Sequence, residues 1–135
     1  MNTQPSRILV VDDDIDSAEG LALLLRHLGH QVQVVSTGRS ALAEAGVFQP
    51  TVAIIDIGLP DVDGLEVAAE LRRSEATRHC HLLALTGLGQ NEDIERGLDA
   101  GFERYLVKPV ALPDLVESVD AAILAPAVPI QGPPQ

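Results

Sequence analysis

The sequence predicts an α/β fold in which a doubly wound, five-stranded parallel sheet is flanked by five helices. Five short apolar runs rich in β-branched residues recur along the chain, and a helical pattern follows each of them. Most of these runs are continuous rather than alternating, which is typical of strands buried on both faces of a parallel sheet. The alternation of strands and helices favours parallel strands joined by right-handed crossovers.

The five expected strands are short, and most of their residues are apolar. They are Ile8–Val11, Val32–Val35, Val52–Ile55, Leu82–Leu85 and Tyr105–Val107. The second of them is preceded by Gln31 and begins by alternating polar and apolar side chains. Because such alternation suits a strand with one exposed side, we expect this strand at an edge of the sheet.

Apolar residues at spacings of three and four predict the helices between these strands. The helices are expected over residues 15–28, 41–46, 65–71, 91–99 and 112–123. Glycines are expected to end three of them, because glycine readily adopts the left-handed conformation that closes a helix. These glycines are Gly29, Gly46 and Gly101 for the first, second and fourth helices.

The length and composition limit the organisation of the chain. A chain of 135 residues suits a single domain. We expect an N-terminal extension over residues 1–6, the folded domain over residues 7–124, and a flexible, proline-rich tail over residues 125–135. The 9 basic and 20 acidic side chains give a net charge of −11, which argues against a nucleic-acid binder.

The remaining composition excludes several other classes of protein. The single cysteine, Cys80, rules out an internal disulfide framework and a cysteine-rich zinc site, and we expect it to be half-buried in packing. No apolar run approaches the roughly 18 residues of a membrane span, and no signal peptide is evident. We therefore expect a cytoplasmic protein with no membrane contact.

Four of the five expected strands end in polar or charged side chains. These are, in order, Asp12 to Asp14, Asp56, Thr86, and Lys108, the single lysine of the chain. Ligands of open parallel sheets bind at this carboxyl edge. Carboxylate oxygens suit Mg²⁺, whereas a hydroxyl and an ammonium suit the oxygens of a phosphoryl group. A carboxylate can also be the nucleophile that forms an aspartyl-phosphate, so these residues predict a site of phosphoryl transfer.

Four motifs surround these strand ends. They are Val10-Val11-Asp12-Asp13-Asp14, Asp56-Ile57-Gly58-Leu59-Pro60-Asp61-Val62-Asp63-Gly64, Ala84-Leu85-Thr86-Gly87 and Val107-Lys108-Pro109. Together, in this order and spacing, they resemble the CheY-like receiver domains of two-component response regulators, over roughly Arg7 to Leu124. This resemblance implies a flavodoxin-like sheet with strand order 2-1-3-4-5. The residues from Leu85 to Gln90, with 100–102 and 107–110, are most similar to receivers of hybrid sensor histidine kinases.

The resemblance implies a metal site and a phosphoacceptor. Asp56 would accept the phosphoryl group and contribute to the metal site. Asp13 would ligate Mg²⁺ directly, Asp12 would hold it mainly through water, and the backbone carbonyl of Gly58 would complete the protein ligands. Mn²⁺ is the alternative metal.

The resemblance also implies a switch. Thr86 would bind a phosphoryl oxygen, and Lys108 would pair first with Asp56 and then with the phosphoryl group. The peptide bond between Lys108 and Pro109 is usually cis in the family. Tyr105 matches the aromatic residue that turns inward with the threonine; the alternative is a strand residue that packs on the fourth helix.

The partners follow from the same resemblance. A sensor histidine kinase or a histidine phosphotransfer protein would donate the phosphoryl group, and a downstream protein would read the face made by the fourth helix, fifth strand and fifth helix. We expect a monomer or weak dimer, with no activity beyond its own phosphorylation and dephosphorylation, either alone or as part of a hybrid kinase. The alternative is a pseudo-receiver that binds partners independently of phosphorylation. A small-molecule phosphatase would need a cap insertion, for which the chain is too short.

Two partial motifs have simpler explanations. Asp12, Asp14 and Asp16 imitate the start of a calcium-binding EF-hand loop, but Ser17 stands where that loop needs glycine. The segment 61–64 imitates a phosphatase motif but does not directly follow an apolar strand, so we interpret it as the loop into the third helix. The four histidines lack metal-binding spacing and are expected at the surface or at helix ends: His27, His30, His79 and His81.

Overall fold

Five parallel strands form one sheet, in the order β2-β1-β3-β4-β5, in the computed structural model, which describes residues 6–87 and 101–125. The strands are β1 (Arg7–Val11), β2 (Gln31–Val35), β3 (Val52–Asp56), β4 (His81–Thr86) and β5 (Arg104–Val107). The predicted fold class and strand order are confirmed, and β2 lies at an edge of the sheet as its alternating side chains indicate.

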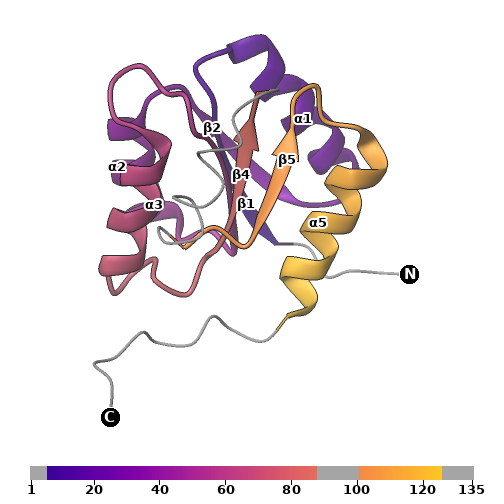
Figure 1. Ribbon diagram of the computed structural model, residues 1–135. Helices are drawn as coiled ribbons and strands as arrows, with labels where there is room; N and C mark the ends of the chain where they lie inside the picture. The colour runs from indigo at the N-terminus through magenta and orange to yellow at the C-terminus, as the bar shows by residue number, and fades with distance from the viewer. Residues whose placement is uncertain (1–5, 88–100, 126–135) are drawn as a thin grey trace.

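The helices cover both faces of the sheet. They are α1 (Ile15–His27), α2 (Gly38–Phe48), α3 (Gly64–Arg73) and α5 (Leu112–Leu124). Figure 1 shows α2 and α3 together on one side of the sheet and α1 and α5 on the other. The helix expected over residues 91–99 and nearly all of the expected tail lie outside the described residues. None of the described helices combines the length and the apolar character that a membrane span requires.

The alternation of side chains along β1 explains the two cores. Ile8 and Val10 point toward α1 and α5, whereas Leu9 and Val11 point toward α2 and α3, and all four are fully buried. Strands β3 and β4 are likewise buried on both faces. A central strand with two covered faces needs apolar residues at every position, and this is the reason for the continuous apolar runs in the sequence.

The second helix is longer than its sequence pattern predicts. It continues past Gly46 to Phe48, and Gln49 takes the left-handed conformation (φ 50°) at its end. The Arg7 side chain donates hydrogen bonds to the carbonyls of Phe48 (2.8 Å) and Gln49 (2.9 Å), so a distant cation satisfies the end of the helix. The prediction that Gly46 ends this helix is therefore wrong, whereas Gly29 (φ 101°) does follow α1 as expected.

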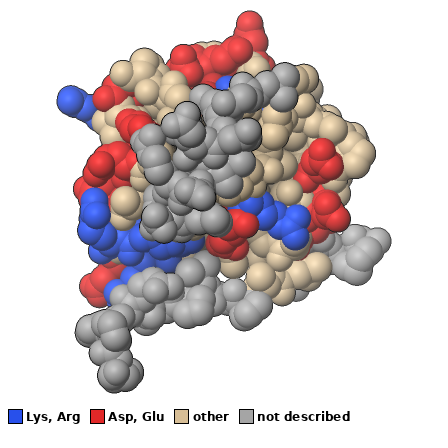
Figure 2. Space-filling model, in the orientation of Figure 1, with Lys and Arg blue, Asp and Glu red and all other residues tan. Residues whose placement is uncertain are grey.

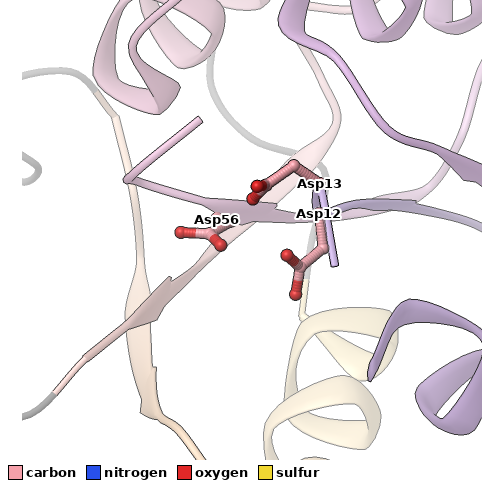
Figure 3. A group of neighbouring side chains, drawn as sticks. All are labelled: Asp12, Asp13 and Asp56. Atoms are coloured by element: carbon pink, nitrogen blue, oxygen red, sulfur yellow. The ribbon is translucent and has the colours of Figure 1, made fainter. Parts of the chain in front are cut away.

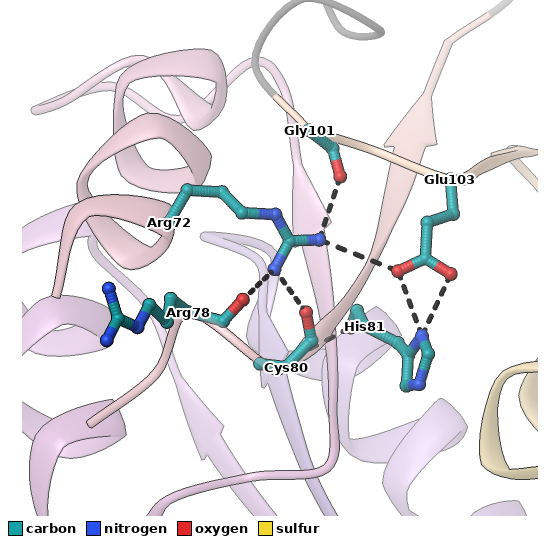
Figure 4. Close-up of polar contacts among 6 residues, drawn as sticks. All are labelled: Arg72, Arg78, Cys80, His81, Gly101 and Glu103. Atoms are coloured by element: carbon teal, nitrogen blue, oxygen red, sulfur yellow. Dashed lines mark hydrogen bonds and ion pairs between the residues drawn. The ribbon is translucent and has the colours of Figure 1, made fainter. Parts of the chain in front are cut away.

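A partly buried arginine, with its side chain 14% exposed, connects several elements at the amino end of the sheet (Figure 4). Arg72, at the end of α3, donates to the carbonyls of Arg78 (2.9 Å), Cys80 (2.5 Å) and Gly101 (3.0 Å). Its guanidinium also lies 3.5 Å from the carboxylate of Glu103. A planar guanidinium with five donors can satisfy several carbonyls at once, so Arg72 joins α3, the start of β4 and the segment before β5.

Two of the four histidines are buried, contrary to the prediction. His81 lies at the start of β4, with its Nδ1 2.9 Å from each carboxylate oxygen of Glu103. His30 precedes β2, and its Nδ1 accepts a hydrogen bond from the Ser6 amide (3.1 Å). Burial lowers the pKa of His30, and the nearby charge of Asp120 partly opposes this shift. Each of these histidines has a partner more than 20 residues away, which local spacing does not reveal.

The single cysteine is more deeply buried than expected. Cys80 immediately precedes β4 and is only 4% exposed, rather than half-buried. Burial is the main reason that the pKa of its thiol rises to about 12. At neutral pH this thiol is protonated and inert, in agreement with its expected role in packing.

Candidate functional site

Three carboxylates meet at the carboxyl edge of the sheet (Figure 3). Asp12 and Asp13 follow β1, and Asp56 ends the adjacent strand β3. One oxygen from each of the three side chains lies within 4.8 Å of the others. Asp12 and Asp56 are buried, at 1% and 8% exposed, whereas Asp13 faces the solvent. Because parallel strands in register end together, residues more than 40 positions apart converge at this edge.

Lys108 brings a positive charge to this cluster from the end of β5. Its Nζ lies 2.5 Å from Oδ2 of Asp56 and 3.1 Å from Oδ2 of Asp12. Burial alone would lower the pKa of Lys108, but hydrogen bonds and charge attraction from Asp56 and Asp12 outweigh it and raise the pKa. Lys108 is therefore a charged ammonium. The peptide bond that joins it to Pro109 is cis.

Asp12 lies at the centre of the cluster and contacts both the backbone and the lysine. Its Oδ1 accepts a hydrogen bond from the Asp14 amide (3.0 Å). Its Oδ2 is buried and forms an ion pair with the Lys108 ammonium (3.1 Å). Burial raises the pKa of Asp12, and the neighbouring Asp56 raises it further, against the opposing effects of the Asp14 amide and Lys108. One ammonium is therefore shared between Oδ2 of Asp12 and Oδ2 of Asp56, which leaves the three carboxylates with an excess of negative charge.

The donor set of the cluster fits a hard divalent cation. Three carboxylates face one ammonium, so the local charge is negative by two when all of them are ionised. Three carboxylate oxygens within 4.8 Å of one another, one of them on an exposed residue, suit Mg²⁺, which keeps several of its waters when it binds to proteins. The three carboxylates thus have the chemistry of a magnesium site, with the Lys108 ammonium beside it.

The loop between β3 and α3 starts from the cluster itself. Oδ1 of Asp56 accepts a hydrogen bond from the Gly58 amide (2.8 Å), so both oxygens of Asp56 have partners. The loop closes where the Gly64 amide donates to the Ile57 carbonyl (3.1 Å). A Cβ on Gly64 would lie 2.3 Å from the Asp56 carbonyl oxygen, so only glycine fits at this position. The hydrogen bond from its amide thus holds Gly58, whose carbonyl is expected to bind Mg²⁺, beside Asp56.

Thr86 and Tyr105 lie on the neighbouring strands. Thr86 ends β4, next to β3 in the sheet, and is 4% exposed. Tyr105 lies on β5, is half-buried against the core under α2 and α3, and its ring centroid is 6.3 Å from that of Phe102. The structure therefore brings Thr86 to the same sheet edge as the carboxylates. A contact of Tyr105 with the fourth helix lies outside the described residues.

A pocket beside the cluster was not predicted from the sequence. It has a volume of about 450 Å³ and lies between α1 and the segment that follows β5. Its lining combines polar residues, among them Asp12, Asp16 and Lys108, with apolar residues that include Leu24 and Pro109. Leu24 is 38% exposed on α1, in a row with Gly20 four residues earlier. This interruption of the polar face of α1 is the signal in the sequence that points to the pocket.

Charged side chains of both signs occur on the face seen in Figure 2. Basic side chains gather at the lower left of this view, with acidic ones beside them, and other acidic side chains are scattered over the face. Several of the arginines are in ion pairs, such as Arg26 with Glu19 and Arg73 with Glu66 and Glu70. Such exposed pairs contribute little to stability and mainly favour solubility.

The fold and the acidic edge define the class of protein: a doubly wound α/β domain with a carboxylate and lysine site beyond its central strands. The family model described as the response regulator receiver domain matches residues 8–120. The chain therefore belongs to the receiver domain family of two-component response regulators.

Curated relatives show the same similarity. RpaA of Synechocystis, a DNA-binding dual master transcriptional regulator, is 37% identical over 117 residues, which cover 87% of this chain and 48% of RpaA. MtrA of Mycobacterium tuberculosis, a DNA-binding response regulator, is 33% identical over 123 residues, which cover 91% of this chain and 53% of MtrA. The chain thus spans about half the length of these relatives.

Solved structures agree in fold. The crystal structure of a putative response regulator from Chloroflexus aurantiacus is 33% identical, with a TM-score of 0.85 over 90% of this chain and all of that one. The receiver domain of a sensor histidine kinase from Pseudomonas aeruginosa is 30% identical, with a TM-score of 0.82 over the same shares of the two chains. A magnesium ion is coordinated in the active-site cleft of that kinase receiver.

Proposed function

We propose that this receiver domain accepts a phosphoryl group on Asp56 from a phosphohistidine of a sensor histidine kinase or a histidine phosphotransfer protein. The observation that carries the proposal is the place of Asp56 at the sheet edge, between the Lys108 ammonium and two further carboxylates. A carboxylate that is held beside an ammonium and a cation site can receive an anionic group without prohibitive repulsion.

The metal of the proposed reaction is Mg²⁺, with Mn²⁺ as the alternative. Asp12, Asp13 and Asp56 would hold it with the backbone carbonyl of Gly58. The closeness of the three carboxylates, which have one oxygen each within 4.8 Å of the others, and the magnesium ion in the cleft of the Pseudomonas receiver support this assignment. When bound, the metal supplies positive charge that offsets the carboxylates and the incoming phosphoryl oxygens.

The transfer itself is an in-line displacement at phosphorus. One carboxylate oxygen of Asp56 forms the new O–P bond while the N–P bond to the donor imidazole breaks, and that nitrogen keeps the bonding electron pair. Lys108 then moves its ion pair from Asp56 to a phosphoryl oxygen, and the Thr86 hydroxyl donates to another. Slow attack by water on the aspartyl-phosphate returns Asp56 and inorganic phosphate.

The donor protein would approach over the pocket beside the cluster. The pocket offers an apolar surface, including Leu24 and Pro109, directly next to Asp12 and Lys108. An apolar surface that borders a charged site lets a partner bury side chains there while it presents a phosphorylated group to the carboxylates.

The output would pass through Thr86 and Tyr105 to the face made by the fourth helix, β5 and α5. A second hollow, of about 330 Å³, lies between β5 and α5 and is lined by residues that include Tyr105, Asp114 and Glu117. Arg104, Asp114 and Glu117 give this hollow charges of both signs, and the net charge of −11 favours a protein as the downstream partner rather than direct contact with nucleic acid. DNA binding belongs to relatives about twice as long as this chain.

We further propose that the chain acts as a monomer or weak dimer and that its motifs are of the kind found in receivers attached to hybrid sensor kinases. The receiver of a Pseudomonas sensor histidine kinase matches 90% of this chain, and the response regulator from Chloroflexus aurantiacus matches the same share.

The test is phosphorylation by a small donor. The protein is incubated with acetyl phosphate and Mg²⁺, and its intact mass is measured. We expect one phosphoryl adduct on the wild type, none without Mg²⁺, and none on Asp56→Asn, which keeps the shape of the side chain but removes the nucleophile. Beryllofluoride, followed by NMR, checks that the same site binds a phosphoryl mimic.

The control separates this proposal from the pseudo-receiver. Glu19→Gln changes an exposed acidic residue of α1 that does not line the pocket, and it should be labelled as the wild type is. An unlabelled but folded wild type would favour a phosphorylation-independent interaction module. Equal labelling of Asp56→Asn would place the phosphoryl group on another residue.

A further inference from the structure

The carboxylate of Asp61 caps α2 from a different part of the chain. Asp61 lies in the loop between β3 and α3, yet its Oδ1 accepts from the Gly38 amide (2.8 Å) and its Oδ2 from the Arg39 amide (3.1 Å). These amides belong to the first turn of α2, where backbone N–H groups have no partner inside the helix. An anion is favoured there because the helix dipole is positive at this end.

The same loop packs against the start of α2. A Cβ on Gly38 would lie 2.8 Å from Cβ of Val62 and 3.0 Å from the Val62 carbonyl, so the two backbones touch where Gly38 has no side chain. The hydrogen bonds from the Gly38 and Arg39 amides also lower the pKa of the Asp61 carboxyl, and the Gly38 bond is the larger cause. Asp61 is therefore ionised at neutral pH and joins two elements that are separate in sequence.

This contact restrains the loop between β3 and α3, which contains Gly58, the residue predicted to bind the metal through its carbonyl. The loop leaves Asp56 through the bond between the Gly58 amide and Oδ1 of Asp56, and it ends where Asp63 caps α3 by accepting from the Leu65 amide (2.8 Å). Asp61 lies between these two ends, and it holds the middle of the loop to α2. Exposed Gly58 has no side chain of its own to fix the loop by packing.

We propose that Asp61 is a positioning residue, which holds the loop against α2 and thereby sets the place of the Gly58 carbonyl for Mg²⁺. This inference rests on the proposed function, because it assigns Gly58 to the metal site. Asp61 does not touch the reacting groups; it acts by limiting the conformations of the loop before the metal binds. Substitution of a residue that orients a metal ligand commonly weakens the binding of the metal by about an order of magnitude.

The experiment compares two caps of the same helix. Thr37 also caps α2, because its Oγ1 accepts from the Ser40 amide (3.0 Å), but it belongs to the segment before α2 and not to the loop. Mg²⁺ is titrated into the wild type, Asp61→Ala and Thr37→Ala, and amide NMR shifts give each Kd. We expect Asp61→Ala to bind Mg²⁺ about tenfold more weakly, with a shifted Gly58 amide resonance in the metal-free protein. Thr37→Ala should keep the wild-type Kd although α2 loses a cap in both variants.

Two additional measurements separate position from charge and from folding. Asp61→Asn keeps one acceptor oxygen at an exposed position, so it should fold normally and have a Kd between those of the wild type and Asp61→Ala. Repeating the titrations in 0.5 M salt screens long-range attraction between Asp61 and the metal, and the ratio of the Kd values should persist.

The outcomes distinguish this inference from the proposed function. If the wild type does not bind Mg²⁺, the metal site of the proposed function fails. If the wild type binds Mg²⁺ and Asp61→Ala binds it equally well, the proposed function stands and the positioning role is wrong. Equal weakening by Thr37→Ala, or a difference that vanishes in salt, would also overturn the positioning role.

Discussion

The charged side chains at the two ends of the sheet differ in how they are paired. At the amino end, Arg72 gives its donors to three carbonyls and to Glu103, and Glu103 in turn binds His81. At the carboxyl end, three carboxylates share one ammonium, so negative charge is in excess. Both clusters join distant parts of the chain, but a cation faces a single carboxylate only at the amino end, where Arg72 pairs with Glu103.

This difference helps to distinguish charged clusters that stabilise the fold from charged clusters that bind a ligand. A satisfied buried cluster holds its elements in place and has no capacity for a ligand. An unsatisfied one weakens the metal-free protein, and it persists where a ligand completes it. The contrast predicts that mutations at the two ends change stability in opposite directions.

The largest expected effect is at the amino end. Arg72→Ala should lower the free energy of unfolding by about 3 kcal/mol, because it leaves buried carbonyls without a donor. Urea denaturation measures this change. Arg72→Lys should recover only part of the loss, since a single ammonium cannot reach the three carbonyls together.

Arg73 provides the matched control for Arg72. It is the next residue on α3, is exposed, and pairs with Glu66 and Glu70 on the same helix. Arg73→Ala should leave the urea midpoint nearly unchanged. If both substitutions lowered the free energy of unfolding equally, the contacts of Arg72 would not contribute to stability more than an exposed ion pair does.

At the carboxyl end, we expect a substitution to change the free energy of unfolding by a smaller amount and in the opposite direction. Asp12→Asn should raise the free energy of unfolding of the metal-free protein by about 1 kcal/mol, because it removes one of three clustered charges. The amide oxygen can still accept from the Asp14 amide, as Oδ1 does now. Thermal unfolding with and without Mg²⁺ is the measurement, and Mg²⁺ should stabilise the wild type but not the variant. A metal-free variant less stable than the wild type would contradict the repulsion inferred for this cluster.

The smallest expected effect is the contribution of His30 to the pH dependence of the free energy of unfolding. The folded pKa of His30 lies below the ordinary value of 6.5 because burial favours the neutral ring. The unfolded chain then binds more protons, so the stability that depends on neutral His30 is complete above about pH 6.5 and is lost as the pH falls through the folded pKa. Urea midpoints at pH 7.5 and 5.5 should therefore differ less for His30→Asn than for the wild type. The exposed His27→Asn should retain the wild-type difference; if both variants respond alike, His30 is not the group responsible.

Much of the fold could be predicted from the sequence because parallel strands buried on both faces leave continuous apolar runs. Val52–Ile55 and Leu82–Leu85 are such runs, and both form central strands. The convergence of Asp12, Asp56 and Lys108 was also predictable, since each follows a strand and parallel strands end at one edge. Local pattern and topology together were sufficient for these residues.

What could not be predicted depends on contacts between distant side chains and the backbone. Arg72 looks like an ordinary cation in the last turn of a helix, and nothing in its neighbourhood reveals three carbonyl partners. Asp61 was correctly placed in the loop before α3, but its bonds to Gly38 and Arg39 span more than 20 residues. The end of α2 at Phe48 likewise depends on Arg7, about 40 positions earlier. Backbone acceptors and donors have no sequence signature, so such partners become visible only in three dimensions.

The ion pair between Asp56 and Lys108 also has a consequence for the synthesis of the protein. The two residues are 52 positions apart, and the chain must reach the end of β5 before the pair can form. A nascent or truncated chain that stops before β5 contains all three carboxylates but lacks the single lysine. The complete cluster therefore appears only when β5 has been made and has joined the sheet, so an incomplete chain lacks the ammonium that pairs with Asp12 and Asp56.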